Sequence, residues 1–224
     1  MTRIARGFDM VQAQAALARA DRKLGTWMRR IGPLEHDFSA SFDPFAALAR
    51  SIMYQQLSGK AAATITGRVE ALMPTRKRLS AAGIQALDDP ALRAAGVSRQ
   101  KIAAMRDLAD KTVSGVVPSA RKLAGMDNDA IIAHLTQVRG IGRWTVEMLL
   151  MFRLGRPDVL PVDDLGIRKG AQILRGLEAM PSPRELAQLG ERWAPWRTLA
   201  SFYLWQIVEF GQPAVAKVRR SQDA

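Results

Sequence analysis

Residues 135–170 read LTQVRGIGRWTVEMLLMFRLGRPDVLPVDDLGIRKG, and this segment decides the fold. A tight turn, Val138–Gly142, separates two apolar stretches of helical period. Its glycines, Gly140 and Gly142, allow positive φ and leave a surface without side chains, so N–H groups at the next helix start can approach an anion. Downstream, Pro161-Val162-Asp163 puts a carboxylate at a loop-to-helix junction. The segment therefore predicts two helices joined by an anion-binding hairpin, followed by an acidic residue before a further helix.

The rest of the chain has the same helical period. N-cap residues and prolines mark several helix starts, and Ser182–Glu185 has the pattern of a capping box. The single strand-like run, 159–162, is interrupted by Pro161. We therefore expect an all-α fold with short loops. The predicted helices include Asp9–Leu24, Pro44–Tyr54, Lys60–Met73, one starting at Asp89-Pro90, Arg99–Val113, Asp127–Val138, Leu165–Leu177 and Trp196–Phe210.

Composition restricts the function. The chain has 33 Lys and Arg against 21 Asp and Glu, a net charge of +12, which favours a polyanionic partner such as nucleic acid over a merely solubilising surface. It has no cysteine, which excludes disulfides, zinc–thiolate sites, four-cysteine iron–sulfur clusters and zinc deaminases. No apolar run is long enough to span a membrane, and no signal peptide begins the chain. We expect a cytoplasmic, nucleoid-associated protein without membrane contact.

The hairpin, Trp144-Thr145 and Pro-x-Asp, in this order, resemble the helix-hairpin-helix and Gly/Pro-Asp signature of base-excision DNA glycosylases. The resemblance is strongest to the DNA-3-methyladenine glycosylase II branch and covers roughly residues 44–211. It implies a single bilobed unit over residues 1–224: a central helical barrel lobe, 44–158, that contains the hairpin, and a second helical lobe from 1–43 and 159–224. The extra N-terminal β domain of larger relatives is not expected here.

By this resemblance Asp163 is the catalytic residue. The aspartate of the family motif stabilises positive charge that builds on the deoxyribose as the glycosidic bond breaks. The alternative is that Asp163 only caps the following helix. Motif spacing matches Asp163 to the catalytic position and leaves the adjacent Asp164 as the cap.

Trp144 bears on the type of reaction. Relatives that also cut the DNA backbone carry at this position a lysine whose amine forms a Schiff base. A tryptophan there implies hydrolysis by water without lyase activity. Trp144 and Trp205, with Met148 and Tyr54, are also the expected base pocket, since an indole face attracts the positive charge of an N-alkylated base. The alternative for each tryptophan is ordinary core packing.

Tyr54-Gln55-Gln56-Leu57-Ser58 matches the family's Gln-Gln-(Ile/Leu)-Ser element. In relatives a side chain of this loop fills the stack that a flipped base leaves. The resemblance assigns this wedge to Gln56, assisted by Leu57. The alternative is that Gln55 and Gln56 only join the two lobes.

The hairpin is expected to bind the DNA backbone through Gly140, Gly142, Thr145, Arg139 and Arg143. Further phosphate contacts are expected from Arg99, Lys101, Arg168 and Lys169. The resemblance also implies a structural Na⁺ or K⁺ on the main-chain carbonyls of Thr136, Val138 and Ile141, and no other cofactor. The segment Glu191–Arg197 is expected to be structural, with Trp193 and Trp196 packing the C-terminal lobe.

These features favour a monomeric, monofunctional DNA glycosylase that flips and hydrolyses N-alkylated bases, of the 3-methyladenine and 7-methylguanine type, from double-stranded DNA in base excision repair. Two alternatives remain open at the level of sequence. One is a glycosylase for deaminated or oxidised bases, and the other is a non-catalytic helix-hairpin-helix DNA-binding protein. The latter explains the charge and the hairpin but leaves Asp163 and the tryptophans without a role.

Overall fold

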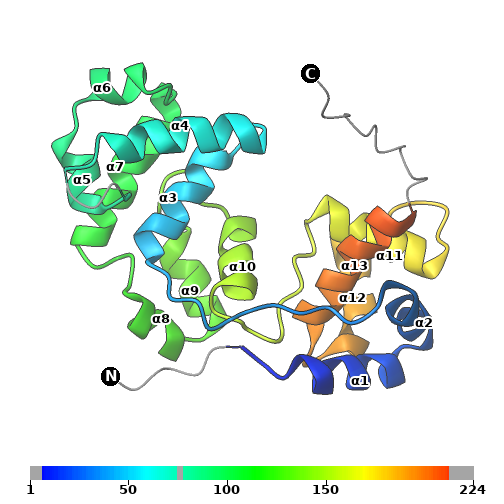
Figure 1. Ribbon diagram of the computed structural model, residues 1–224. Coiled ribbons are helices and arrows are strands. Elements are labelled where there is room, and N and C mark those ends of the chain that lie inside the picture. The colour runs from blue at the N-terminus through cyan, green and yellow to red at the C-terminus, as the bar shows by residue number, and fades with distance from the viewer. Residues whose placement is uncertain (1–6, 75–77, 212–224) are drawn as a thin grey trace, which may run out of the picture. The chain divides into compact units, whose positions relative to one another are not determined.

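A computed structural model describes residues 7–74 and 78–211, and in these ranges every regular element is a helix. This confirms the all-α expectation. The chain divides into two compact units (Figure 1). Unit 1 comprises residues 38–155, and unit 2 comprises residues 7–37 and 156–211. These boundaries lie a few residues from the expected ones at 44 and 158.

Unit 1 is built around its longest helix, α7 (Arg99–Val113). Helices α3, α5 and α6 pack on α7, and α3 also contacts α4 and α10 (Figure 1). Buried aliphatic side chains such as Leu48, Ile52 and Leu108 fill the space between them. The other helices of this unit are α3 (Pro44–Tyr54), α4 (Gly59–Ala71), α5 (Ala81–Ala86), α6 (Asp89–Ala94), α8 (Ala120–Gly125), α9 (Asn128–Leu135) and α10 (Arg143–Phe152).

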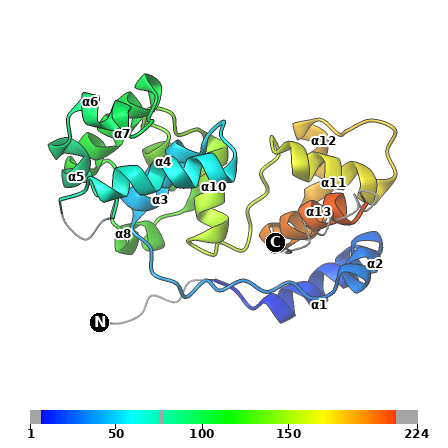
Figure 2. The same ribbon diagram turned by 45° about the horizontal axis from the view of Figure 1, so that its top comes forward.

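Unit 2 combines α1 (Met10–Ala20) and α2 (Arg22–Ile31) with α11 (Leu165–Arg175), α12 (Pro183–Gly190), a 3-10 turn η1 (Glu191–Trp193) and α13 (Arg197–Gly211). Helices α11 and α13 lie side by side and make the most extensive packing of this unit (Figure 2). Gly170 permits their close approach, because a Cβ there would collide with the carbonyl oxygen of Leu204. The start of α11, where Asp163 and Asp164 lie, is thereby fixed against α13.

The single helix predicted over Asp9–Leu24 is wrong, because the chain breaks at Asp21. This residue has extended backbone angles, and its carboxylate caps α2 by accepting the Leu24 N–H at 3.1 Å. The same carboxylate accepts the Trp193 Nε1–H at 2.9 Å and pairs with Arg175. Burial by itself would raise the pKa of Asp21. The hydrogen bonds from Trp193 and Leu24 and the interaction with Arg175 outweigh this effect and hold the pKa below its ordinary value. The three partners of this buried carboxylate therefore fix a break between α1 and α2, although the sequence pattern would continue a single helix.

Other helix ends differ from the predictions by a few residues. Helix α9 ends at Leu135 rather than Val138, and α11 ends at Arg175, where Gly176 adopts φ +70. The short helices α5 and α8 were not predicted. The capping box at Ser182 and Glu185 is confirmed, with both of its hydrogen bonds present.

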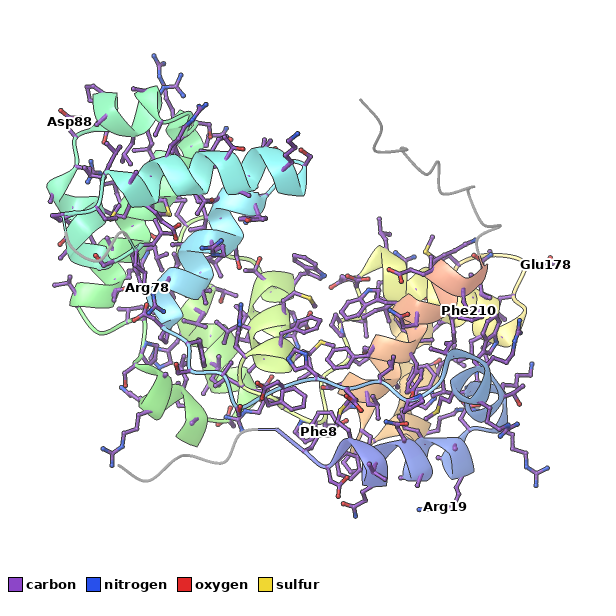
Figure 3. All side chains as sticks on the ribbon, viewed as in Figure 1. Phe8, Arg19, Arg78, Asp88, Glu178 and Phe210 are labelled. Carbon is purple, nitrogen blue, oxygen red and sulfur yellow. The ribbon has the colours of Figure 1, made fainter. Side chains whose placement is uncertain are left out.

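The structural role predicted for Trp193 is also confirmed, since its side chain is fully buried. Trp196 is half-buried, and its ring centroid lies 5.7 Å from that of Phe8. Phe8 is labelled in Figure 3. Both tryptophans therefore pack the unit that contains Asp163.

Candidate functional site

The hairpin between α9 and α10 is a tight hydrogen-bonded turn. The Val138 N–H donates to Leu135 O at 3.1 Å, and the Ile141 N–H donates to Val138 O at 3.0 Å. Val138 and Ile141 are buried, whereas Gly140 is exposed and has φ +78, as the sequence predicted. Two apolar anchors thus hold the turn on the unit while its tip faces solvent.

Gly142 differs from the expectation of positive φ. It is the N-cap of α10 with φ −94, and no side chain of the described chain caps this helix. Helices α1 to α9, α11 and α12 each begin with an Asp or Ser side chain that accepts a backbone N–H. A Cβ on Gly142 would meet nothing within 4 Å, so the protein's own packing does not require glycine. Donor groups at an uncovered helix start suit a phosphate.

Each of the two hairpin arginines donates a hydrogen bond to a carboxylate of unit 1, Arg143 from its side chain and Arg139 from its backbone. Arg143 is exposed, and its Nε–H donates at 3.0 Å to the carboxylate of Glu147, which is buried. The Arg139 N–H donates to Asp107 Oδ2 at 2.7 Å, and the residue itself is exposed. Thr145 is only 7% exposed, so its side chain packs inside the unit and is not presented to solvent.

The predicted wedge loop, Tyr54–Ser58, lies between α3 and α4. Gln56 has φ +56, and among the described residues it alone adopts positive φ without being glycine. Its side chain and that of Leu57 are exposed. Gln55 behaves differently, since its Nε2–H donates at 2.8 Å to Gly140 O. Gln55 therefore binds the hairpin within unit 1, whereas the Gln56 side chain makes no polar contact with the described residues.

The pocket residues of unit 1 are consistent with a surface for an aromatic ligand. Trp144 is 48% exposed, which excludes simple core packing. Met148 lies one turn further along α10 and is half-buried, as is Tyr54 at the end of α3. The exposed indole of Trp144 therefore lies in the first turn of α10, next to the uncapped start of that helix.

In unit 2 the structure separates the roles of the two aspartates. Asp164 is the N-cap of α11, and its Oδ1 accepts the Ile167 N–H at 2.8 Å and the Trp205 Nε1–H at 3.0 Å. Asp163 is exposed in the turn before the helix and, within the described residues, has no hydrogen bond or ion pair. The prediction that Asp164 caps the helix is confirmed. Trp205 is half-buried, lies against Phe202 and is oriented by Asp164.

Three of the four residues expected to make additional phosphate contacts instead donate hydrogen bonds to the protein itself. Lys101 donates from Nζ to Met53 O at 2.6 Å and to Gln55 O at 2.9 Å, and burial lowers its pKa. Arg168 donates to Pro181 O, and Lys169 to the side chain of Gln172. Arg99 is exposed at the start of α7. The charges of Lys101 and Arg168 were visible in the sequence, but their partners are backbone carbonyls, which no residue type marks.

The sequence reasoning missed Asp107. Its carboxylate receives the Arg139 N–H and both contacts of Lys111 Nζ, at 2.7 and 2.8 Å. Burial raises the pKa of Asp107, but the Arg139 N–H and Lys111 lower it by more, so the group stays ionised. Its only signal was the Asp107–Lys111 spacing of a helical ion pair, which is common on helices that hold no site.

The expected cation ligands fit the proposed ion in their chemistry. In the described chain the carbonyl oxygens of Thr136 and Ile141 accept no hydrogen bond, and that of Val138 accepts only the Ile141 N–H. Neutral carbonyl oxygens are the donors that monovalent cations take in proteins. The described residues hold no cluster of three or more acidic or histidine side chains suited to another metal. No helix in residues 7–74 and 78–211 is long and apolar enough to cross a membrane.

Comparison with known proteins identifies close similarities. Residues 49–195 match the family described as HhH-GPD superfamily base excision DNA repair protein. DNA-3-methyladenine glycosylase 1 of Schizosaccharomyces pombe is 39% identical over 178 residues, 78% of each chain. A solved structure of the S. pombe 3-methyladenine DNA glycosylase in complex with abasic DNA has a TM-score of 0.77 at 35% identity, covering 87% of this chain and 95% of that one. The DNA-3-methyladenine glycosidase of Bacillus halodurans has a TM-score of 0.81 at 36% identity, covering 89% and 90%.

Proposed function

Because the chain belongs to the HhH-GPD superfamily of base excision DNA repair proteins, we propose that it is a monofunctional DNA glycosylase for N-alkylated bases. The substrate class is double-stranded DNA that carries 3-methyladenine or 7-methylguanine. The names of its relatives support this class, since they are called 3-methyladenine glycosylases. The observation that carries the proposal is the unpartnered carboxylate of Asp163 directly before α11, beside a cap residue that already satisfies the helix.

Binding begins at the hairpin. The exposed tip at Gly140 and the uncapped start of α10 at Gly142 offer N–H donors to a phosphate, and Arg139 and Arg143 add positive charge. Backbone contacts of this kind are independent of sequence, as a search for rare lesions in any context requires. The net charge of +12 supplies the long-range attraction to DNA.

The base then leaves the helical stack. Gln56 and Leu57, both exposed, fill the vacated position, and the Gln56 amide offers hydrogen bonds to the orphaned base. Trp144 presents its indole to the extruded base, together with Met148 and Tyr54 of the same unit. A positively charged ring over an indole face gains roughly 0.5–2 kcal/mol, a gain that normal bases lack.

Alkylation also makes the base a good leaving group. The bond between C1′ and the base nitrogen breaks, its electron pair leaves with the base, and positive charge develops on the sugar. The negative charge of Asp163 stabilises this charge. A water molecule adds its oxygen to C1′ and gives up a proton to the solvent, which leaves an intact abasic site. Trp144 occupies the position of the lyase lysine, so no amine attacks the sugar and the strand is not cut.

A monovalent cation, when bound, would be held by the carbonyls of Thr136, Val138 and Ile141 and would supply positive charge beside the phosphate site. We further propose that the protein acts as a monomer in the cytoplasm, without another cofactor.

The test is base release from a panel of oligonucleotides with methylated, deaminated or oxidised bases, with strand breaks scored before and after alkali. Release of methylated bases alone supports the proposal. Preferential release of deaminated or oxidised bases would assign a different lesion class, and tight DNA binding without release of any base would identify a non-catalytic binding protein.

A further inference from the structure

One face of α7 contacts both of the loops that the proposed function directs at DNA. Lys101, Ala104, Asp107 and Lys111 follow one another at intervals of three or four residues, so they lie on the same side of the helix. At one end of this face lies the wedge loop, Tyr54–Ser58, and at the other the hairpin, Val138–Gly142. Three of these residues, Lys101, Asp107 and Lys111, make hydrogen bonds to backbone atoms of the two loops and so hold the course of the chain there.

At the wedge loop, Lys101 satisfies carbonyl groups at the end of α3. Its Nζ donates to Met53 O and Gln55 O, which are among the carbonyls that a helix end leaves without partners. Gln55 is followed directly by Gln56, whose positive φ is unfavourable for a residue other than glycine and persists only where the surroundings fix it. Lys101 therefore anchors the residue from which the strained wedge projects.

At the hairpin, Asp107 and Lys111 bind the turn from below. Asp107 receives the Arg139 N–H at 2.7 Å, and Lys111 donates to Gln137 O at 2.7 Å. Ala104 lies under Gly140, where its Cβ is 3.5 Å from the position a Cβ of Gly140 would take. The Gln55 amide closes the arrangement by its 2.8 Å hydrogen bond to Gly140 O. A direct bridge thus joins the wedge loop to the hairpin tip.

We propose that Lys101 and Gln55 are positioning residues that fix the wedge loop to the hairpin, so that phosphate binding and insertion of Gln56 occur as one event. This inference rests on the proposed function, because it takes the hairpin as the phosphate site and Gln56 as the wedge. Its physical basis is pre-organisation: a loop already fixed relative to the bound backbone enters the stack without first being ordered.

Two variants remove the hydrogen bonds and keep the side-chain length: Lys101→Met and Gln55→Met. Lys122→Met, on exposed α8 of the same unit, is the matched control. We expect single-turnover excision of an alkylated base from a fully paired duplex to slow by about tenfold in either variant. Excision from the single strand, and affinity for abasic duplex, stay near wild type, because neither needs a base to be displaced by the wedge. Lys101→Arg restores most of the rate.

A double-mutant cycle with Gln56→Ala identifies the route of the effect. If Gln55 acts through the wedge, Gln55→Met adds little to the loss that Gln56→Ala already causes. Independent, multiplying losses, or an equal loss on paired and single-stranded substrates, would overturn the inference.

Amide hydrogen exchange tests the same inference without DNA chemistry. Lys101→Met should speed exchange in residues 54–58, and Gln55→Met should speed it in both that loop and the hairpin, while Lys122→Met changes neither. Unchanged exchange in both loops would refute the positioning role even if the protein excises alkylated bases. Faster exchange in a protein that excises no base would instead refute the proposed function alone.

Discussion

Asp163 and Asp164 offer a matched pair of substitutions. They are adjacent and equally charged, but only Asp164 accepts hydrogen bonds from the described residues. Asp163→Asn and Asp164→Asn each delete one negative charge from the same turn and keep the side-chain size. An amide oxygen still accepts hydrogen bonds, and Asn is as good an N-cap as Asp. Asp164→Asn therefore retains both the Ile167 and the Trp205 hydrogen bonds. Asp163→Asn loses no described contact.

We therefore expect both variants to melt within a degree or two of wild type. Excision should separate them. Removing an electrostatic stabiliser at the reacting centre costs on the order of 3–4 kcal/mol, or two to three orders of magnitude in rate, and this loss should follow Asp163→Asn alone. Binding to abasic duplex should survive in both, since phosphate contacts dominate the affinity.

Asp164→Ala completes the series. It removes an N-cap worth about 1 kcal/mol and a partly buried indole hydrogen bond worth about 1 kcal/mol. The sum, about 2 kcal/mol, corresponds to a fall of roughly 4–8 °C in Tm. The assay is single-turnover excision from an alkylated duplex together with thermal melting. If Asp164→Asn abolishes excision and Asp163→Asn spares it, the roles are reversed and the argument from hydrogen-bond partners is wrong.

Three further outcomes are expected. Gln56→Ala should slow excision from a paired duplex by about tenfold more than excision from a mispaired site, which has less stacking to replace; an equal loss would indicate a structural role. Reaction products should show strand breaks only after alkali, and borohydride should trap no covalent adduct, because Trp144 supplies no amine; an adduct would refute hydrolysis by water. Asp21, whose folded pKa lies below its ordinary 3.8, should stabilise the protein fully above that pH and lose this contribution as pH falls through the folded value. Urea unfolding at pH 7 and pH 3 should therefore show a larger change in wild type than in Asp21→Asn, and equal changes would contradict the assigned Arg175 and Trp193 contacts.

The extent to which the fold follows from sequence depends on how local the determining contacts are. Helix α7 was predicted residue by residue, because its periodicity extends over several turns and Ser98 marks its start. Helices α5 and α8 have six residues each, too few to show a period. The break at Asp21 was missed because its partners Arg175 and Trp193 lie 154 and 172 residues further along the chain. No local pattern reports such distant partners.

The candidate site divides along the same line. Gly140 at positive φ and Asp164 as the cap were predictable, because turn geometry and N-cap chemistry depend on neighbouring residues. Lys101 was assigned to phosphate and instead binds Met53 O and Gln55 O. The lysine can be recognised in the sequence. The carbonyl groups that accept its hydrogen bonds cannot, because every residue has a main-chain carbonyl.

Gln55-Gln56 and Asp163-Asp164 are doublets, that is, pairs of adjacent identical residues. Within each doublet the structure gives the two members different surroundings, which no sequence motif shows. In each, one side chain is bound by the protein itself: Gln55 by Gly140 O, and Asp164 by the Ile167 and Trp205 N–H groups. The other, Gln56 or Asp163, is exposed and has no polar partner among the described residues. A side chain that already satisfies the fold could serve DNA only by breaking that bond, at a cost of about 1 kcal/mol or more and with loss of the local structure. Its neighbour can act at no such cost and is held in place by it. The exposed member of each doublet is therefore the one to assign to the substrate, and the bound member is the one to assign to its position.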